Sequence, residues 1–158
     1  MTTFDTECLR RAIALSRAHM RTGAGGPFGA VVARDGRILG EGWNQVTSTN
    51  DPTAHAEIVA IRSACRDLGT FSLAGATVYT SCEPCPMCLA AIYWARADRI
   101  VYANGRDDAA SIGFDDAFLY TEIALALDRR AVPMQRLLAE EARAVFEEWA
   151  AKPDRVPY

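Results

Sequence analysis

The stretch that decides the fold is ATVYTSCEPCPMCLAAIYWARADRIVYA, residues 76–103. Its first part, Ala76 to Ser81, is rich in β-forming side chains and predicts a strand. Pro86 to Arg96 is apolar on nearly every side, which predicts a buried helix, and Arg99 to Ala103 predicts a second strand. A strand, a helix and a strand in succession indicate a parallel crossover, so we expect an α/β domain.

The segments on either side extend this architecture. Asp5 to Arg21 predicts an amphipathic helix, and Asp51-Pro52 predicts the start of another helix that runs to Gly69. Strands are expected on both sides of an Asp-Gly hairpin turn and again near the C-terminus, at 28–33, 38–43 and 132–138. With helices after residue 113 and around Ala142 to Trp149, the sum is one three-layer α/β/α sandwich over 1–158, with a mixed five-stranded sheet flanked by helices.

Composition and charge restrict the classes of function. The 158 residues include 17 Lys and Arg against 20 Asp and Glu, and the basic residues form no run. A net charge of -3 gives no general attraction for a polyanion, so we expect a small-molecule partner and no nucleic acid. The sequence has neither a secretory signal nor an apolar run near the ~20 residues of a membrane span, which predicts a cytoplasmic protein.

The cysteines point to the chemistry. Three of the five, Cys82, Cys85 and Cys88, fall within seven residues. Cys85 and Cys88 stand where a strand gives way to a helix, and the positive end of the helix favours thiolates. Two thiolates with the imidazole of His55 would give Zn²⁺ three protein ligands and leave a fourth position for water or hydroxide, which is the pattern of a catalytic zinc site.

Glu57 follows His55 by two positions, so we do not expect it on the same face of a helix or in the same ligand shell. A carboxylate beside an activated water is suited to take a proton and deliver it to a substrate nitrogen, as a general acid and base does. His-Ala-Glu at 55–57 together with Pro-Cys-Pro-Met-Cys at 84–88 matches the signature of zinc nucleobase deaminases.

Over nearly its full length the chain resembles the bacterial guanine deaminases of the cytidine-deaminase-like superfamily. The segments that carry the resemblance are GGPFGAV at 25–31, NDPTAHAE at 50–57, SCEPCPMC at 81–88, IYWAR at 92–96, GFDD at 113–116 and a terminal tyrosine at 158. The zinc motifs identify the superfamily, whereas the GFDD segment and the tyrosine favour guanine as the substrate. The resemblance implies the cytidine-deaminase-like form of the α/β/α sandwich and one zinc ion per subunit.

The resemblance also implies roles for individual residues. It places Asn44, Phe28, Ala56, Trp94, Asp116 and Tyr158 around the base, with Glu57 and Asp116 catalytic. The implied reaction is attack of zinc-bound hydroxide at C2 of guanine, protonation of N3 by Glu57, and loss of ammonia to leave xanthine. Members of the family resemble one another in forming homodimers that exchange C-terminal segments, so residues 153–158 are expected to close the site of the partner subunit.

Other interpretations stay open. A tRNA adenosine deaminase, or a deaminase of cytosine or another nucleobase, would share every zinc residue. If Cys82 were a fourth ligand, the same residues would close a structural zinc module with no enzymatic activity. A thiol oxidoreductase would account for Cys85 and Cys88 but would leave His55 and Glu57 without a role.

Overall fold

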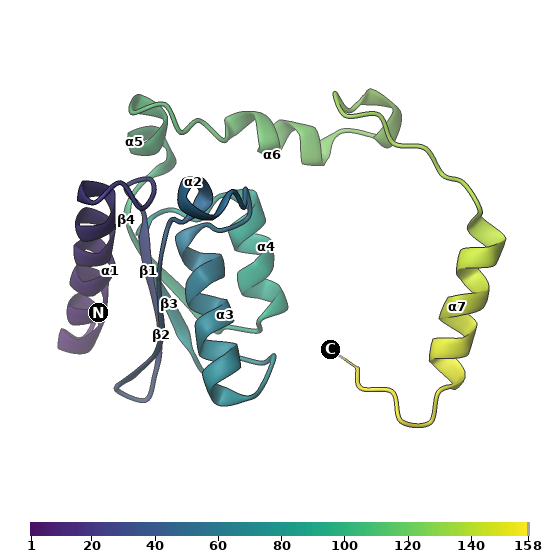
Figure 1. Ribbon diagram of the computed structural model, residues 1–158, viewed down its shortest axis with the longest axis horizontal. Helices are drawn as coiled ribbons and strands as arrows, with labels where there is room; N and C mark the ends of the chain where they lie inside the picture. The colour runs from purple at the N-terminus through teal and green to yellow at the C-terminus, as the bar shows by residue number, and fades with distance from the viewer. Residues whose placement is uncertain (158) are drawn as a thin grey trace. The chain divides into compact units, whose positions relative to one another are not determined.

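The computed structural model describes residues 1–157 and divides into two compact units, Met1–Ala117 and the residues from Phe118 onward (Figure 1). Each unit is described by itself. The elements in chain order are α1 (Thr3–Arg21), β1 (Gly29–Arg34), β2 (Arg37–Trp43), α2 (Val46–Thr49), α3 (Ala56–Leu68), β3 (Thr77–Cys82), α4 (Pro86–Trp94), β4 (Arg99–Asn104), α5 (Arg106–Ser111), α6 (Ala117–Ala124), the 3-10 turn η1 (Leu127–Arg129) and α7 (Ala139–Ala151).

The first unit is built on a four-stranded sheet with the order β2-β1-β3-β4. β1 runs antiparallel to both β2 and β3, while β3 and β4 are parallel and are joined through α4. The parallel crossover predicted from residues 76–103 is therefore confirmed. Helix α1 covers one face of the sheet and α3 with α4 covers the other, which gives three layers (Figure 1).

The sheet has four strands in the described part of the chain, so the prediction of five strands is wrong. Residues 132–138 form no strand. An apolar segment becomes a strand only when a neighbouring edge pairs with its backbone, and Pro133 also lacks one N–H donor. The apolar pattern of this segment carries no information about whether such an edge is near.

Helix α3 begins at Ala56, later than the predicted start at Asp51-Pro52. The Asp51 carboxylate accepts hydrogen bonds from the backbone N–H and the hydroxyl of Thr53, at 2.8 and 2.6 Å, and so closes a turn where a helix cap was predicted. His55 becomes the N-cap residue with an extended backbone. The imidazole is therefore attached to the last residue before the helix, and Glu57 lies in its first turn.

The contact between α3 and the sheet is unusually close because small residues meet on both sides. Gly40 and Gly42 of β2 face Ala60 and Ala64 of α3, and both alanines are fully buried. A Cβ atom at Gly42 would lie 2.3 Å from the carbonyl oxygen of Ala56 and 2.5 Å from the backbone nitrogen of Ala60. A side chain at this position would push the start of α3 away from the sheet.

On the opposite face, a buried carboxylate joins α1 to the sheet. Asp5 is 2% exposed and accepts hydrogen bonds from the hydroxyl of Tyr79 and the backbone N–H of Thr2, both at 2.7 Å, and it also pairs with Arg99. The Thr2 backbone, then Tyr79 and then Arg99 hold the pKa of this carboxyl well below its usual range. These hydrogen bonds hold α1 against β3 and β4, and each polar group that they join has a hydrogen-bond partner.

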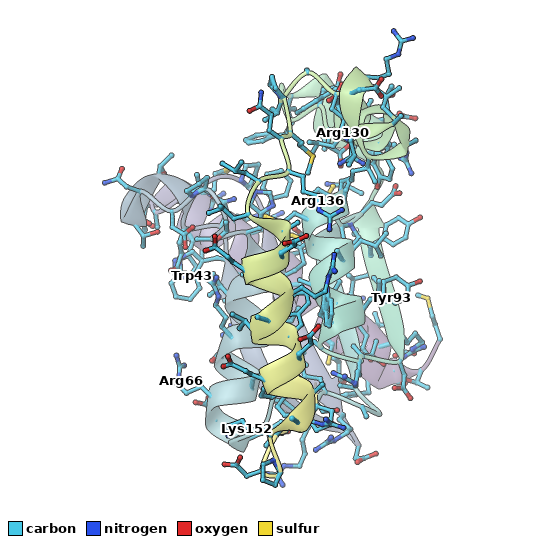
Figure 2. The ribbon with its side chains drawn as sticks, turned by 90° about the vertical axis from the view of Figure 1, so that its right-hand side faces the viewer. Trp43, Arg66, Tyr93, Arg130, Arg136 and Lys152 are labelled. Atoms are coloured by element: carbon cyan, nitrogen blue, oxygen red, sulfur yellow. The ribbon has the colours of Figure 1, made fainter. Side chains whose placement is uncertain are left out.

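The second unit contains α6, η1 and α7, and no residue of these helices is buried. The guanidinium of Arg130 donates hydrogen bonds to the carbonyl oxygens of Leu125 and Ile123 and so closes the turn after α6 (Figure 2). About 40 residues rarely bury enough apolar surface to form a core alone. Many large apolar side chains are exposed in this unit: Phe118, Ile123, Leu127, Val132, Met134, Leu137, Leu138, Val145, Phe146 and Trp149.

None of the helices within residues 1–157 combines the length and the apolar character needed to cross a bilayer.

The close contact at Gly42 predicts a specific sensitivity. Gly42→Ala should lower the free energy of unfolding by about 1–3 kcal/mol, because the methyl group overlaps the backbone of α3. Gly105→Ala is the control without a clash, since a Cβ there would lie 3.8 Å from its nearest neighbour, and as a change at the N-cap of α5 it should cost less than about 1 kcal/mol. Urea unfolding of both variants measures the difference, and equal stabilities would contradict the close-packing argument.

Candidate active site

Two helix starts meet at the edge of the sheet where β3 ends. His55 is the N-cap residue of α3, Cys85 is the N-cap residue of α4, and Cys88 lies in the first turn of α4. Helices α3 and α4 lie side by side on the same face of the sheet (Figure 1). Nδ1 of His55 is 3.5 Å from the Sγ atom of each cysteine, and the three ligand atoms all lie within 4.8 Å of one another.

The two thiols affect each other's protonation strongly. The hydrogen bond from Cys88, followed by that of His55, lowers the pKa of Cys85 to about 4. The same contact and burial raise the pKa of Cys88, and the hydrogen bond with Cys85 raises the pKa of His55. The Sγ atoms of Cys85 and Cys88 lie within 4.8 Å of each other, so both can be thiolates only when a bound cation balances their negative charges. Two thiolates and an imidazole around one point are the donors that Zn²⁺ prefers, and they leave one coordination position open.

Glu57 is buried beside this cluster and outside it. Its side chain is 6% exposed, and the hydroxyl of Thr80 on β3 donates a 3.0 Å hydrogen bond to its Oε1. Burial raises the pKa of this carboxyl above its usual value. Among residues 1–157 the metal-ligand cluster contains His55, Cys85 and Cys88 without Glu57, in line with the prediction that the carboxylate does not join the ligand shell.

Cys82 does not belong to the cluster that the described residues form. Its Sγ atom lies 3.7 Å from the carbonyl oxygen of Gly105, to which the thiol donates. Burial, and then the charge of Glu57, raise the pKa of Cys82 to about 11, so this thiol stays protonated. The arrangement fits a centre with three protein ligands and argues against the closed four-ligand module.

Asn44 and Phe28 meet at the same end of the sheet, where β2 ends and β1 begins. The backbone N–H of Asn44 donates to the carbonyl oxygen of Phe28 at 3.0 Å, and that of Gln45 donates to Ala54, next to His55, at 2.9 Å. The ring of Phe28 also packs edge-to-face with Phe114, with centroids 4.9 Å apart. The structure therefore gathers both predicted base-binding residues beside the segment that carries His55.

The other predicted residues are placed differently. Ala56 is fully buried at the start of α3. The pKa of Asp116 is raised by burial and then by the charge of Cys85. Trp94 is 66% exposed at the opposite end of α4 from the cysteines, and the first unit does not bring it to the cluster. Tyr158 lies outside the described residues.

Two residues that contribute to the site were not singled out from the sequence. Thr80 supports Glu57, but a threonine in a strand gives no signal that separates it from any other strand residue. Phe114, which supports Phe28, lies within the GFDD segment at 113–116, so the motif contained a signal that was assigned only to its acidic residues.

The chain belongs to the family described as the cytidine and deoxycytidylate deaminase zinc-binding region, which it matches over residues 2–104. The cofactor is therefore zinc, as the donor set indicates. This confirms the predicted cofactor, and the cytidine-deaminase-like fold is confirmed apart from the number of strands.

Within that family the chain is similar to guanine deaminase of Bacillus subtilis (strain 168), with 50% identity over 141 residues, 89% of this chain and 90% of that protein. The X-ray structure of guanine deaminase from Bacillus subtilis superimposes with a TM-score of 0.95 and 46% identity, covering 100% of this chain and 99% of that one. The tRNA-specific adenosine deaminase of Haemophilus influenzae is 39% identical over 119 residues, 72% of this chain and 68% of that protein.

The position of Cys82 predicts how zinc binding responds to substitution. Cys82→Ser should keep about one zinc ion per chain, because its sulfur faces Gly105. Cys88→Ser should weaken zinc binding by about 100-fold or more, because it removes a thiolate from the cluster. Metal analysis after dialysis against a chelator measures both, and loss of zinc from Cys82→Ser would support the four-ligand module instead.

Proposed function

We propose that this protein catalyses the zinc-dependent hydrolytic deamination of guanine to xanthine and ammonia. The observation that carries the proposal is the cluster of His55, Cys85 and Cys88 with the buried Glu57 beside it. This cluster lies in a chain with 50% identity to a guanine deaminase over 90% of that protein's length. The sequence interpretation and the family membership lead to the same function.

His55, Cys85 and Cys88 are the residues that hold the zinc ion. When bound, Zn²⁺ supplies a Lewis acid that lowers the pKa of a water molecule towards 7, so that a nucleophile is available at neutral pH. The protein contributes the geometry. The N-cap position of His55 and the N-terminal position of both cysteines on α4 present three donors to one point, with no further ligand from Cys82.

Glu57 moves the protons of the reaction. Its carboxylate accepts a proton from the attacking water and delivers it to N3 of the base. It then moves the second proton, from the hydroxyl group now on C2, to the amino group, which leaves as ammonia while C2 becomes a carbonyl carbon of xanthine. Thr80 supports this role because its hydroxyl holds Oε1 at 3.0 Å and so restricts the rotamer of the side chain. Burial raises the pKa of Glu57, which brings a carboxyl closer to the working pH of a general acid and base.

The base is held by residues of several segments. Asn44 contacts polar atoms at the edge of the ring, Phe28 packs on the purine beside the buried Ala56, and Asp116 contacts the amino or ring N–H groups. The edge-to-face contact with Phe114 supports this assignment, because it fixes the ring of Phe28. Asp116 is also the carboxyl whose charge interacts with Cys85, which supports a place next to the zinc ligands.

A tRNA-specific adenosine deaminase is the second candidate function, because a relative of that name covers 72% of this chain at 39% identity. Two observations favour guanine. The guanine deaminase matches more of the chain at higher identity, and the net charge of -3 gives no general attraction for folded RNA.

The active form is a cytoplasmic homodimer. Each subunit is one domain, and the two subunits exchange their C-terminal segments. The apolar side chains of the second unit support this, since Phe146 is 75% exposed and α7 buries none of its residues. Tyr93 and Trp94 of α4 are also exposed apolar surface, and Figure 2 shows Tyr93 pointing outward. In this arrangement Tyr158 closes the partner's site, and Trp94 lies near it.

Replacing Glu57 tests the reaction. Glu57→Gln should lower kcat for guanine by about 10²- to 10⁴-fold, because the amide cannot transfer the protons, and zinc content should stay unchanged. Ammonia release is measured with guanine, cytosine, cytidine, adenine, adenosine and a tRNA, each with and without a chelator. Chelator-sensitive release from guanine alone is the expected result of the unsubstituted protein. Silence on guanine with turnover of a tRNA substrate would establish the second candidate.

Mixing two inactive variants tests the exchange of segments. A chain that lacks 153–158 and a Glu57→Gln chain should each have little activity, but refolding them together in equal amounts should restore about one quarter of the original activity. In the mixed dimer, one site keeps Glu57 and receives an intact tail from the partner. If each tail closed its own site, mixing would restore nothing.

A further inference from the structure

The side-chain amide of Asn44 is held in one orientation by the backbone around it. Its Oδ1 accepts a hydrogen bond from the N–H of Gly26 at 3.1 Å and a second one from the N–H of Val46 at 3.3 Å. A backbone N–H can only donate, so the oxygen must face these two groups. The NH₂ group of Asn44 consequently points the other way.

The NH₂ group is available to a ligand. Asn44 is only 7% exposed, and no group within residues 1–157 accepts a hydrogen bond from its nitrogen. The nitrogen nevertheless keeps access to solvent, because the described residues include no fully buried side-chain nitrogen or oxygen that lacks a partner. A donor that is held in place and left unpaired in a nearly buried residue is ready to bind an acceptor atom.

The close approach of Gly25 to Asn44 maintains this orientation. A Cβ atom at Gly25 would lie 1.8 Å from the carbonyl oxygen of Asn44 and 2.9 Å from its Oδ1, so a side chain there would separate the two segments. A Cβ atom at Gly26 would lie 3.4 Å from the rings of Phe114 and Phe28, which is an ordinary contact. The hydroxyl of Ser48 adds a further tie, since it donates to the carbonyl oxygen of Ala24 at 2.7 Å.

We propose that Gly25, Gly26 and Val46 act as positioning residues that make Asn44 an obligatory hydrogen-bond donor, so that the site selects bases with an acceptor atom facing it. This inference rests on the function proposed above. In this arrangement the donor faces the carbonyl oxygen at position 6 of guanine. The base 2,6-diaminopurine has the same 2-amino leaving group but carries an amino group at position 6. A fixed donor favours the first base, and two donors facing each other disfavour the second.

A double-mutant cycle separates this role from a general effect on folding. Gly25→Ala should lower kcat/KM for guanine by about 10-fold or more, mainly through a higher KM, because the 24–28 turn must move away from Asn44. In an Asn44→Ala background the same substitution should have little further effect. The decrease in kcat/KM for guanine should be larger for Gly25→Ala than for Gly26→Ala, because the added methyl group overlaps Asn44 only at position 25. Zinc content and thermal midpoints of all variants report on folding.

Asn44→Asp gives a second test that does not depend on the glycines. One carboxylate oxygen should still face the two N–H groups, and the other should present an acceptor where the donor stood. The ratio of kcat/KM for guanine to that for 2,6-diaminopurine should therefore fall by about 10-fold or more. The inference would be overturned if Gly25→Ala still lowered kcat/KM for guanine in the Asn44→Ala background. It would also be overturned if Asn44→Asp left the ratio of kcat/KM for the two bases unchanged. Absence of guanine turnover by the unsubstituted protein would instead show that the proposed function has failed.

Discussion

The structure depends first on how closely α3 lies against the sheet. Gly40 and Gly42 let the backbone of this helix approach β2, and the buried alanines of α3 fill the remaining space. The approach determines where the helix begins, and its start carries His55 and Glu57. A small displacement would separate His55 from the cysteines of α4 and Glu57 from Thr80. The packing of small residues in the core is therefore also what sets the distances in the zinc centre.

The charge of the cysteines imposes the second constraint. Cys85 and Cys88 lie near enough that one thiol holds the other ionised, and a cation is required for both to be thiolates. Cys82 stays a neutral thiol and needs no cation, because it faces Gly105 and its pKa is raised to about 11. The separation leaves three protein donors at the metal and reserves the remaining coordination position for chemistry. Burial and Thr80 hold Glu57 beside the centre and outside the ligand cluster, which is the position that the proposed proton transfer requires.

Much of the fold could be predicted because local patterns carried it. The strand, helix and strand of residues 76–103 and the Asp-Gly hairpin depend on short-range preferences, and both are confirmed. The predictions failed where contacts with other segments determine the local structure. Residues 132–138 are mostly apolar but have no paired edge within the described chain, and Asp51 closes a turn with Thr53 where a helix cap was predicted. Thr80 and Phe114 were missed because each acts by touching a residue far away in the sequence.

The sequence by itself determined the chemistry of this protein. The ligand types, their placement at helix starts and the acidic residue two positions after His55 define a zinc deaminase, because metal preference follows from donor atoms and local spacing. Only the tertiary structure decided which sulfur atoms share the site, in which direction the oxygen of the Asn44 amide points and what supports Glu57 and Phe28. These features are distances between segments that the chain separates by tens of residues. They are set by how closely the helices pack on the sheet, and no local pattern contains that information.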